Sequence, residues 1–268
     1  MKHVVMFSGG VGSWATAKRV VDEHGTDNLY LVFADVKGEN DSPHLGEDED
    51  VYRFIDEAAA NLGGTLVKLK EGRSIWQVFK DDRFLGNSRL ANCSKFLKQR
   101  PCREWLEANC DPNETVVYVG IDWSEAHRLP AIENAYKPYT AKAPLCEPPL
   151  IDKKDMLKQC REAGIEPPRS YEQGYPHANC GGACVRAGKA QWAMLLKQNR
   201  ERYLFHENQE SELRQYLGKD VTILREQVAG EKVRLTLRGF RERQEEQGSL
   251  FDDDELDLGG CGCFVQDE

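Results

Sequence analysis

The chain has 268 residues, 40% of them hydrophobic, which supports one or two folded domains and excludes a disordered chain or a disulfide-held mini-protein. Its 36 basic and 45 acidic residues give a net charge of −9, which excludes a general nucleic-acid coat but leaves room for a local basic patch. Nine cysteines are more than a chain of this size needs.

The opening sequence MKHVVMFSGG reaches glycines after only a short apolar run, unlike a secretory signal peptide. Nowhere does the chain contain the run of about 18 apolar residues that a transmembrane helix needs. We therefore expect a cytoplasmic protein without a membrane partner. In that reducing compartment, clustered cysteines indicate metal or redox chemistry more than structural disulfides.

Strand-like and helix-like segments alternate through the first half of the chain. Buried apolar runs predict strands at Val4–Phe7, Leu29–Ala34, Thr65–Leu69 and Thr115–Gly120. Helical periodicity predicts helices at Ser13–His24, Glu47–Leu62 and Cys93–Asn109. This alternation predicts an α/β fold: a Rossmann-like, mostly parallel sheet with helices on both faces.

The second half differs in composition, with prolines around Cys146–Leu150 that predict the end of the first domain. We expect three regions: an α/β domain at 1–147, a smaller helical region with a cysteine pair at 148–218, and an extension at 219–268 with an acidic run and a terminal Cys-Gly-Cys. Within them the pattern predicts helices at Lys153–Ala163 and Ala187–Tyr203, a strand at Val221–Leu224, and a helix capped by Thr236.

A glycine-rich loop joins the first predicted strand to the first predicted helix. In this position backbone N–H groups and the helix dipole can hold phosphate oxygens, and serine hydroxyls can add donors. The loop is neither a Walker loop nor GxGxxG, so a tight turn that binds nothing is the alternative. The candidate nucleotide ligands are all six loop residues: Ser8, Gly9, Gly10, Val11, Gly12 and Ser13.

The loop resembles the PP-loop, SGGxDS, of the adenine-nucleotide alpha-hydrolase-like ATP pyrophosphatases, which include the phosphoadenylyl-sulfate (PAPS) reductase family. Three further stretches resemble that branch in the same order. They are Asp50–Asp56 for its ETYxFID helix, Gly120 with Glu125 and Arg128 for its GxRxxES-R strand end, and Pro149–Tyr175 for its approach to a cysteine pair. The resemblance spans roughly residues 3–190 and implies the HUP-type form of the α/β fold.

The resemblance also implies a nucleotide site with ATP, or a PAPS-like adenine nucleotide, and Mg²⁺. Gly12 departs from it, because most PP-loops have Asp there, and this departure weakens the expectation of catalysis more than that of anion binding. Glu125 and Arg128 could instead form only a surface ion pair without a role in catalysis. The implied site residues are Asp35 and Gly120 near the nucleotide, and Ser13, Glu125 and Arg128 as the catalytic set.

Two close cysteine pairs stand out, Cys180 with Cys184 and Cys261 with Cys263. Glycines between such ligands let the backbone fold around a metal, and four thiolates can hold zinc or an iron–sulfur cluster. Cys93 resembles the upstream cysteine of cluster-containing reductase relatives, and Cys180 the downstream one. The resemblance favours a [4Fe-4S] cluster over zinc, bound either by the two pairs or by Cys93 with three of those four cysteines.

The remaining cysteines and the basic residues carry weaker expectations. Single cysteines usually act as small hydrophobes, and we expect this of Cys102, Cys110, Cys146 and Cys160. Basic residues that converge on the sheet edge could hold a phosphate, a sulfate or a nucleic-acid backbone, although most helical Lys and Arg residues are only solvated. The candidates are Arg89, Lys95, Lys98, Arg100, Arg103, Arg186 and Lys189.

The main hypothesis is an adenine-nucleotide-binding enzyme that cleaves ATP between the α- and β-phosphates, adenylates an acceptor, releases pyrophosphate and supports sulfur transfer. The acceptor could be a nucleic acid, tRNA or DNA, the sulfur could come from a donor protein, and a homo-oligomer is compatible. One alternative is a PAPS/APS reductase-type thiol oxidoreductase, in which Cys261 or Cys263 attacks the sulfate sulfur. The other is a non-catalytic nucleotide-binding module with structural zinc, which Gly12 favours.

Overall fold

A five-stranded parallel sheet forms the centre of the computed structural model, which describes residues 1–39, 42–87 and 90–246. The strands stand in the order β3-β2-β1-β4-β5, and all four neighbouring pairs are parallel. This is the order of a Rossmann-like sheet, so the predicted fold class is confirmed. The strands are β1 (Lys2–Met6), β2 (Leu29–Asp35), β3 (Thr65–Lys70), β4 (Thr115–Val119) and β5 (Thr140–Lys142).

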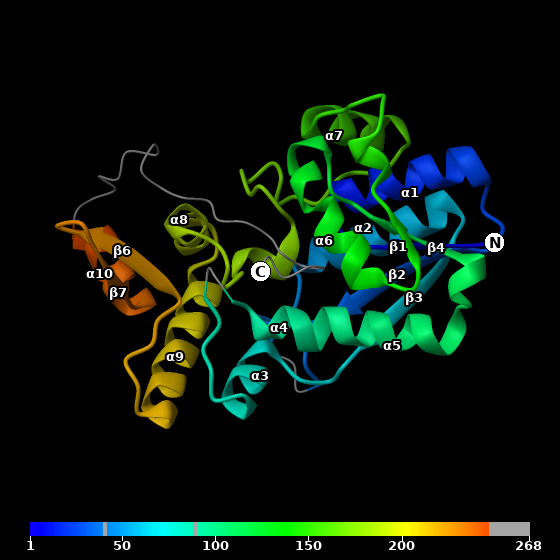
Figure 1. Ribbon diagram of the computed structural model, residues 1–268. Helices are drawn as coiled ribbons and strands as arrows, with labels where there is room; N and C mark the ends of the chain where they lie inside the picture. Colours follow the sequence, from blue (N-terminus) through cyan, green and yellow to red (C-terminus); the bar gives the residue numbers. More distant parts are fainter. Residues whose placement is uncertain (40–41, 88–89, 247–268) are drawn as a thin grey trace.

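Helices cover both faces of the sheet, because successive side chains of the buried strands point to opposite faces. In β1, Val5 packs into one hydrophobic cluster, whereas Val4 and Met6 pack into another. Figure 1 shows α1 and α7 on one side of the sheet and α5 on the other. The covering helices are α1 (Val11–His24), α2 (Glu49–Leu62) and α7 (Lys153–Glu162) on the first face, and α5 (Arg100–Asn109) and α6 (Leu129–Tyr136) on the second.

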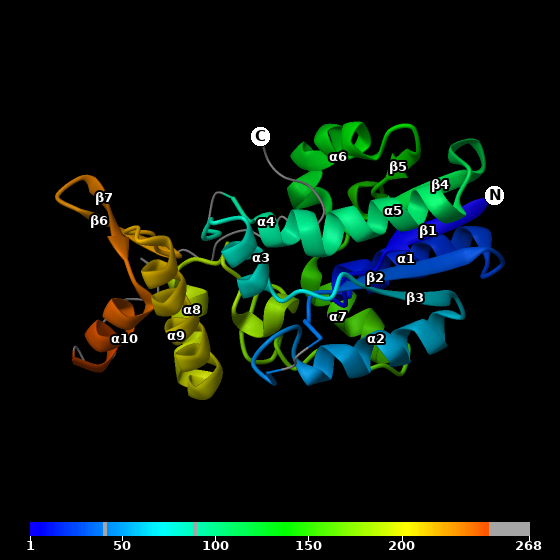
Figure 2. The ribbon, with the colours of Figure 1, turned by 90° about the horizontal axis from the view of Figure 1, so that it is seen from below.

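A second group of elements, which we call the outer body, lies beyond the carboxyl ends of the strands (Figures 1 and 2). Its own hydrophobic cluster contains the buried aromatic side chains Trp76, Phe79, Trp192, Tyr203 and Phe240. The outer body consists of α3 (Ile75–Asp81), α8 (Lys189–Gln198), α9 (Arg200–Leu217), β6 (Leu224–Val228), β7 (Glu231–Leu235) and α10 (Leu237–Glu246). The region predicted at 148–218 therefore contributes helices to both bodies, and the division of the chain into domains stays a prediction.

The helix predicted at Cys93–Asn109 is present but contains a wide turn. It runs as α4 (Asn92–Ser94), a π-helical turn (Lys95–Gln99) and α5. Pro101 lies at the start of α5, where it has no N–H for the preceding carbonyl and its ring crowds that turn. A π-turn is one of the usual ways in which a helix accommodates such a residue.

Two predictions for the outer body are wrong. The helix predicted at Ala187–Tyr203 ends at Asn199, which has φ −144° and ψ 74° and whose side chain accepts a 3.0 Å hydrogen bond from Arg202 N–H. Asparagine is a strong N-cap, so a second helix begins there. The strand predicted at Val221–Leu224 instead begins at Leu224 and forms a β6–β7 hairpin, which turns through Ala229 and Gly230, both with positive φ.

Other features of the helices follow the sequence pattern. Thr236 caps α10, since its Oγ1 accepts a 3.0 Å hydrogen bond from Gly239 N–H, and this prediction is confirmed. The short helix α3 begins with a capping box between Ser74 and Gln77 that the periodicity did not reveal. None of the helices in the described ranges is both long and apolar enough to cross a bilayer.

Candidate functional site

The glycine-rich loop turns sharply between β1 and α1. Gly9 has φ +80°, and a Cβ there would lie 2.8 Å from a methyl group of Val51, so only glycine fits. Gly10 is the N-cap of α1 and supplies no side-chain cap, and the first turn of α1 contains no acidic residue. The Ser13 hydroxyl donates a 2.7 Å hydrogen bond to the Gly10 carbonyl and thereby braces the turn. The positive end of the α1 dipole is thus left without a neutralising carboxylate of its own.

The end of β4 packs tightly against the start of α1. A Cβ on Gly120 would lie 2.9 Å from both the Cα and the N of Ser13, a distance that real Cβ atoms do not reach. A Cβ on Gly12 would lie 3.2 Å from the Gly120 carbonyl oxygen. The departure from Asp at position 12 therefore coincides with a close backbone approach between the start of α1 and the end of β4.

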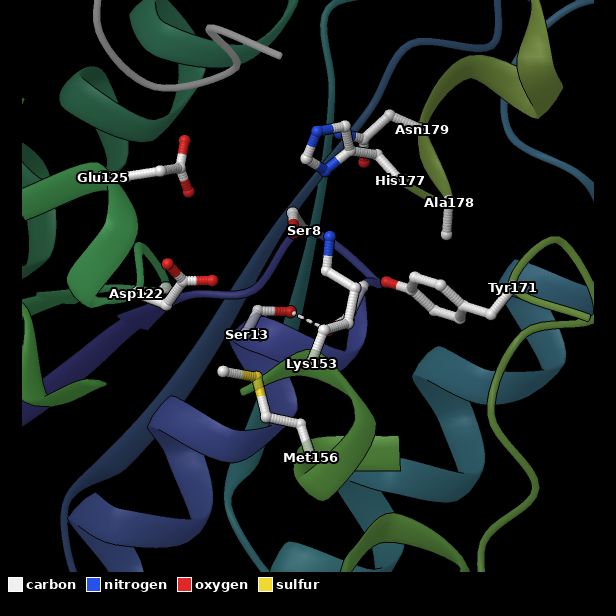
Figure 3. Close-up of a pocket in the computed structure, with 13 residues that line it drawn as sticks. Ser8, Ser13, Asp122, Glu125, Lys153, Met156, Tyr171, His177, Ala178 and Asn179 are labelled. Atoms are coloured by element: carbon white, nitrogen blue, oxygen red, sulfur yellow. Dashed lines mark hydrogen bonds between the residues drawn. The ribbon is translucent and has the colours of Figure 1, made fainter. Parts of the chain in front are cut away.

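A pocket lies at this junction, between the carboxyl ends of β1 and β4 (Figure 3). The strand order reverses here, because the chain passes from β1 to β2 on one side and from β3 to β4 on the other. Ligands of open α/β sheets bind at such switch points. The lining residues are Ser8, Gly10, Gly12, Ser13, Gly120, Asp122, Glu125, Lys153, Met156, Tyr171, His177, Ala178 and Asn179.

Charged groups of both signs reach the pocket. Lys153 projects into it from the first turn of α7, and its ammonium donates a 2.8 Å hydrogen bond to the Pro176 carbonyl. Asp122 and Glu125 approach from the β4 side; Asp122 accepts a 2.9 Å hydrogen bond from Ser124 N–H. Burial, together with Lys153, lowers the pKa of His177 to about 4, so the imidazole is neutral at pH 7.

The structure brings together most of the predicted nucleotide residues. Ser8, Gly10, Gly12, Ser13, Gly120 and Glu125 all line the pocket. Gly9 and Val11 belong to the same loop but do not line it, and Gly9 faces Val51 and Ile55 instead.

Two predicted site residues take other places. Asp35 is not part of the pocket wall: its carboxylate accepts hydrogen bonds from the Tyr52 hydroxyl (2.7 Å) and from Lys37 N–H (2.9 Å). Arg128 forms an ion pair with Glu125, which is the alternative to a catalytic role for these two residues.

Several of the pocket residues were not predicted from the sequence. Asp122 comes two residues after Gly120, so the strand-end rule could have found it. Lys153, Tyr171, His177 and Asn179 come from loops and a helix that follow the sheet in the chain. No local pattern predicts that these residues meet the glycine loop.

The first cysteine pair lies in a loop directly after the pocket wall. Cys180, Gly181 and Gly182 all have positive φ, at 54°, 52° and 86°. A Cβ on Gly181 would lie 2.2 Å from the guanidinium of Arg202, so the glycine is required. A hydrogen bond from the Cys180 thiol lowers the pKa of Cys184 to about 7 and raises that of Cys180.

Buried charges surround this loop. Glu47 accepts hydrogen bonds from Cys180 N–H and, at 3.3 Å, from the Lys98 ammonium; the exposed side-chain fractions of Glu47 and Lys98 are 0% and 6%. Arg202 donates to the carbonyls of Gly46 (2.6 Å) and Cys180 (3.4 Å). One buried carboxylate thus faces two buried cations next to the cysteine pair.

Cys93 approaches the same place from the start of α4. Burial raises its pKa to about 12, and the nearby Cys184 adds to the shift. Cys93 and Cys184 both pack against the cluster of the outer body. Within the described ranges no group of three or more Cys, His, Asp or Glu side chains is arranged to bind a metal ion. Cys261 and Cys263 lie outside the described residues, so the predicted ligand set stays a prediction.

The four single cysteines and the predicted basic residues that the structure describes lie outside the wall of the pocket. Cys102, Cys110 and Cys160 are buried in the two sheet clusters, whereas Cys146 is partly exposed and its thiol donates to the Asp122 carbonyl at 3.3 Å. Arg100 and Arg103 form exposed i,i+4 ion pairs with glutamates of α5. None of Lys95, Lys98, Arg100, Arg103, Arg186 and Lys189 lines the pocket, and Arg89 lies outside the described residues, so an anion-binding role for these residues stays a prediction.

Comparison with known proteins gave matches among solved structures alone. No family model matches the chain, and no curated protein does. Among solved structures, the chain is similar to the crystal structure of phosphoadenylyl-sulfate (PAPS) reductase from Candida auris in complex with phosphate. The two share 16% sequence identity with a TM-score of 0.45, and the match covers 67% of this chain and 82% of that chain. A likeness this distant carries no conclusion about function.

Proposed function

We propose that this chain is an enzyme of the PAPS reductase-like group that binds an adenine nucleotide with its phosphates at the Ser8–Ser13 loop. The observation that carries the proposal is the pocket at the β1–β4 switch point, where the N-terminus of α1, with no acidic residue in its first turn, meets the Lys153 ammonium. Helix N-termini and lysine ammonium groups both favour phosphate oxygens. The PP-loop resemblance gives the site its nucleotide class.

Mg²⁺ would find carboxylates on one side of this pocket. Gly12 offers none, but Asp122 and Glu125 both line the wall opposite the helix N-terminus. Mg²⁺ is commonly held by one or two carboxylates together with substrate phosphates. Asp122 is the better ligand, because Glu125 already pairs with Arg128. When bound, the ion would neutralise charge on the leaving pyrophosphate.

The proposed reaction is cleavage between the α- and β-phosphates. An oxygen of the acceptor attacks the α-phosphorus, the bond from that phosphorus to the bridging oxygen breaks, and pyrophosphate leaves. AMP then remains on the acceptor oxygen and can be displaced by a sulfur nucleophile. The contribution of the chain is positioning and charge neutralisation by the α1 amides, Ser8 and Lys153.

The proposal assigns the sulfur chemistry to the cysteine region. His177–Asn179 line the pocket and Cys180 follows at once, so a nucleotide and the cysteine pair would share one short segment. Cys184 has the lowered pKa that a thiolate ligand or nucleophile needs. The resemblance implies an iron–sulfur cluster here, with Cys93, Cys180 and Cys184 and, outside the described residues, Cys261 or Cys263 as ligands. Because the described cysteines are not arranged as a metal site, no step of the proposed reaction depends on the cluster.

Pyrophosphate release tests the proposal. Protein purified without oxygen is incubated with ATP, Mg²⁺ and tRNA or DNA, and pyrophosphate is measured. The Lys153→Met variant is expected to lose at least about tenfold in ATP affinity, because it removes a charged phosphate contact. Lys154→Met is the matched control, since Lys154 is exposed and does not line the pocket. Absence of both ATP binding and pyrophosphate release in the wild type would sink the proposal.

A reductase of the PAPS type is the second candidate, favoured by the thiol of Cys184, which has a lowered pKa and lies five residues after the pocket residue Asn179 in the chain. In that reaction a thiolate attacks the sulfate sulfur, the bond to the nucleotide phosphate oxygen breaks, and a protein S-sulfonate and adenosine bisphosphate form. Incubation with PAPS and mass analysis of the protein distinguishes the two. A zinc-containing protein without turnover on either nucleotide would point to the non-catalytic module instead.

A further inference from the structure

Tyr171 reaches the glycine loop from a distant part of the chain. It lies in the loop that follows α7, and its ring packs against the cluster of the first sheet face. Its hydroxyl accepts a 3.0 Å hydrogen bond from Val11 N–H, and a Cβ on Gly10 would lie 3.1 Å from the same oxygen. Figure 3 shows the ring extending into the pocket with its oxygen toward the start of α1.

The Tyr171 hydroxyl has a proton left to donate. In the described part of the chain its hydrogen bond with Val11 uses an oxygen lone pair, which leaves the O–H proton available to an acceptor in the pocket. Burial raises the pKa of Tyr171 to about 12, so the group stays protonated throughout the physiological range. Because Tyr171 lines the pocket, an anion oxygen bound there could accept this proton and add a hydrogen bond to a charged group.

The side chain is also held firmly enough to act as a ligand. The ring is packed in the hydrophobic cluster, and the Val11 amide fixes the position of the oxygen. Little conformational freedom would be lost when this group binds an anion, because it is ordered beforehand. The neighbouring Lys153 would attract an anion by its positive charge, whereas the fixed Tyr171 hydroxyl would orient the anion through a directional hydrogen bond.

We propose that the Tyr171 hydroxyl is a phosphate ligand, which accepts from the Val11 amide and donates its proton to an oxygen of the bound nucleotide's phosphate chain. The proposal rests on the nucleotide function of the pocket. Tyr171 shares one segment with the pocket residues His177 and Asn179 and with Cys180. Its contact with the phosphate therefore also sets the position of the cysteine-bearing segment relative to the nucleotide.

The test compares Tyr171→Phe with wild type in calorimetric titrations with inorganic pyrophosphate and with ATP. The dissociation constants of both are expected to rise about tenfold or more, since one hydrogen bond to a charged group is lost. Tyr203→Phe is the matched control: it removes a buried 2.7 Å hydrogen bond to the Leu237 carbonyl in the outer body and is expected to leave both constants unchanged. Circular dichroism establishes that both variants are folded.

Gly10→Ala tests the same oxygen in a second way. The added Cβ would press on the Tyr171 hydroxyl, so this variant is expected to weaken pyrophosphate binding, as Tyr171→Phe does. Unchanged binding in Tyr171→Phe would overturn the ligand role while leaving the proposed function intact. Tighter binding would also overturn it, and would mean that the hydroxyl obstructs the Val11 amide. A wild-type protein that binds neither ATP nor pyrophosphate overturns the proposed function and this role together.

Discussion

The pocket and the cysteine loop are adjacent in the chain but are built on different physical principles. The pocket depends on close backbone approach: Gly12 and Gly120 let the end of β4 meet the start of α1. The cysteine loop depends on buried charge, because Glu47 bonds Lys98 and its charge also favours the Arg202 guanidinium. Steric change should therefore damage the first region, and loss of charge balance should damage the second.

Removal of the Glu47 carboxylate is the largest expected effect. Glu47→Ala removes the acceptor of Cys180 N–H, an acceptor of the Lys98 ammonium, and the carboxylate whose charge favours the buried Arg202 guanidinium. The free energy of unfolding is expected to fall by about 3–5 kcal/mol, the usual cost of breaking a buried ion pair. Urea denaturation of this variant beside Glu49→Ala measures it, since Glu49 is exposed at the start of α2. A loss below about 1 kcal/mol would contradict the buried-charge account.

Added volume at the strand junction should have an intermediate effect. Gly120→Ala places a methyl group 2.9 Å from the backbone of Ser13, so we expect a loss of about 1–3 kcal/mol in unfolding free energy and weaker nucleotide binding. Gly12→Ala meets only the Gly120 carbonyl at 3.2 Å and gains helix propensity, so its effect should stay below about 1 kcal/mol. Equal effects of the two variants in urea denaturation would show that the junction is not the tight contact described.

The smallest expected effect is on the pH dependence of the unfolding free energy, to which a buried histidine should contribute more than an exposed one. Burial lowers the pKa of His206 to about 3; its Nδ1 accepts from the Trp76 indole at 3.0 Å. The stability that the neutral ring provides is complete above the unfolded pKa of 6.5 and is lost as the pH falls below it, because only the unfolded chain takes up the proton.

Between pH 7 and pH 5.5 this loss amounts to about 1 kcal/mol for His206. Urea denaturation at both pH values should therefore show a smaller pH dependence in His206→Gln than in wild type, although the variant is less stable at pH 7. His127→Gln, at an exposed position, should keep the wild-type dependence. An unchanged dependence in His206→Gln would mean that this ring is not the source of the acid sensitivity.

Local patterns were sufficient for β1 to β4 of the sheet and for the position of the glycine loop, but not for β5 or α6. The four predicted strands follow hydrophobic periodicity, and the loop stands between a strand and a helix, where backbone amides can hold an anion. Periodicity failed at Asn199, where a capping side chain divides one apolar stripe into two helices. The resemblance named Asp35, whose carboxylate accepts from the Tyr52 hydroxyl and does not line the pocket.

The nine cysteines that marked this sequence at the outset divide accordingly. Their pairing and the glycines between Cys180 and Cys184 are properties of the sequence, because local spacing alone decides whether two thiols can be neighbours. The meeting of Cys93 with that pair, and the enclosure of both by Glu47, Lys98 and Arg202, are properties of the tertiary structure. The same holds for Lys153 and Tyr171 at the glycine loop, since contacts across more than a hundred residues depend on how the layers pack, and no short-range pattern encodes that.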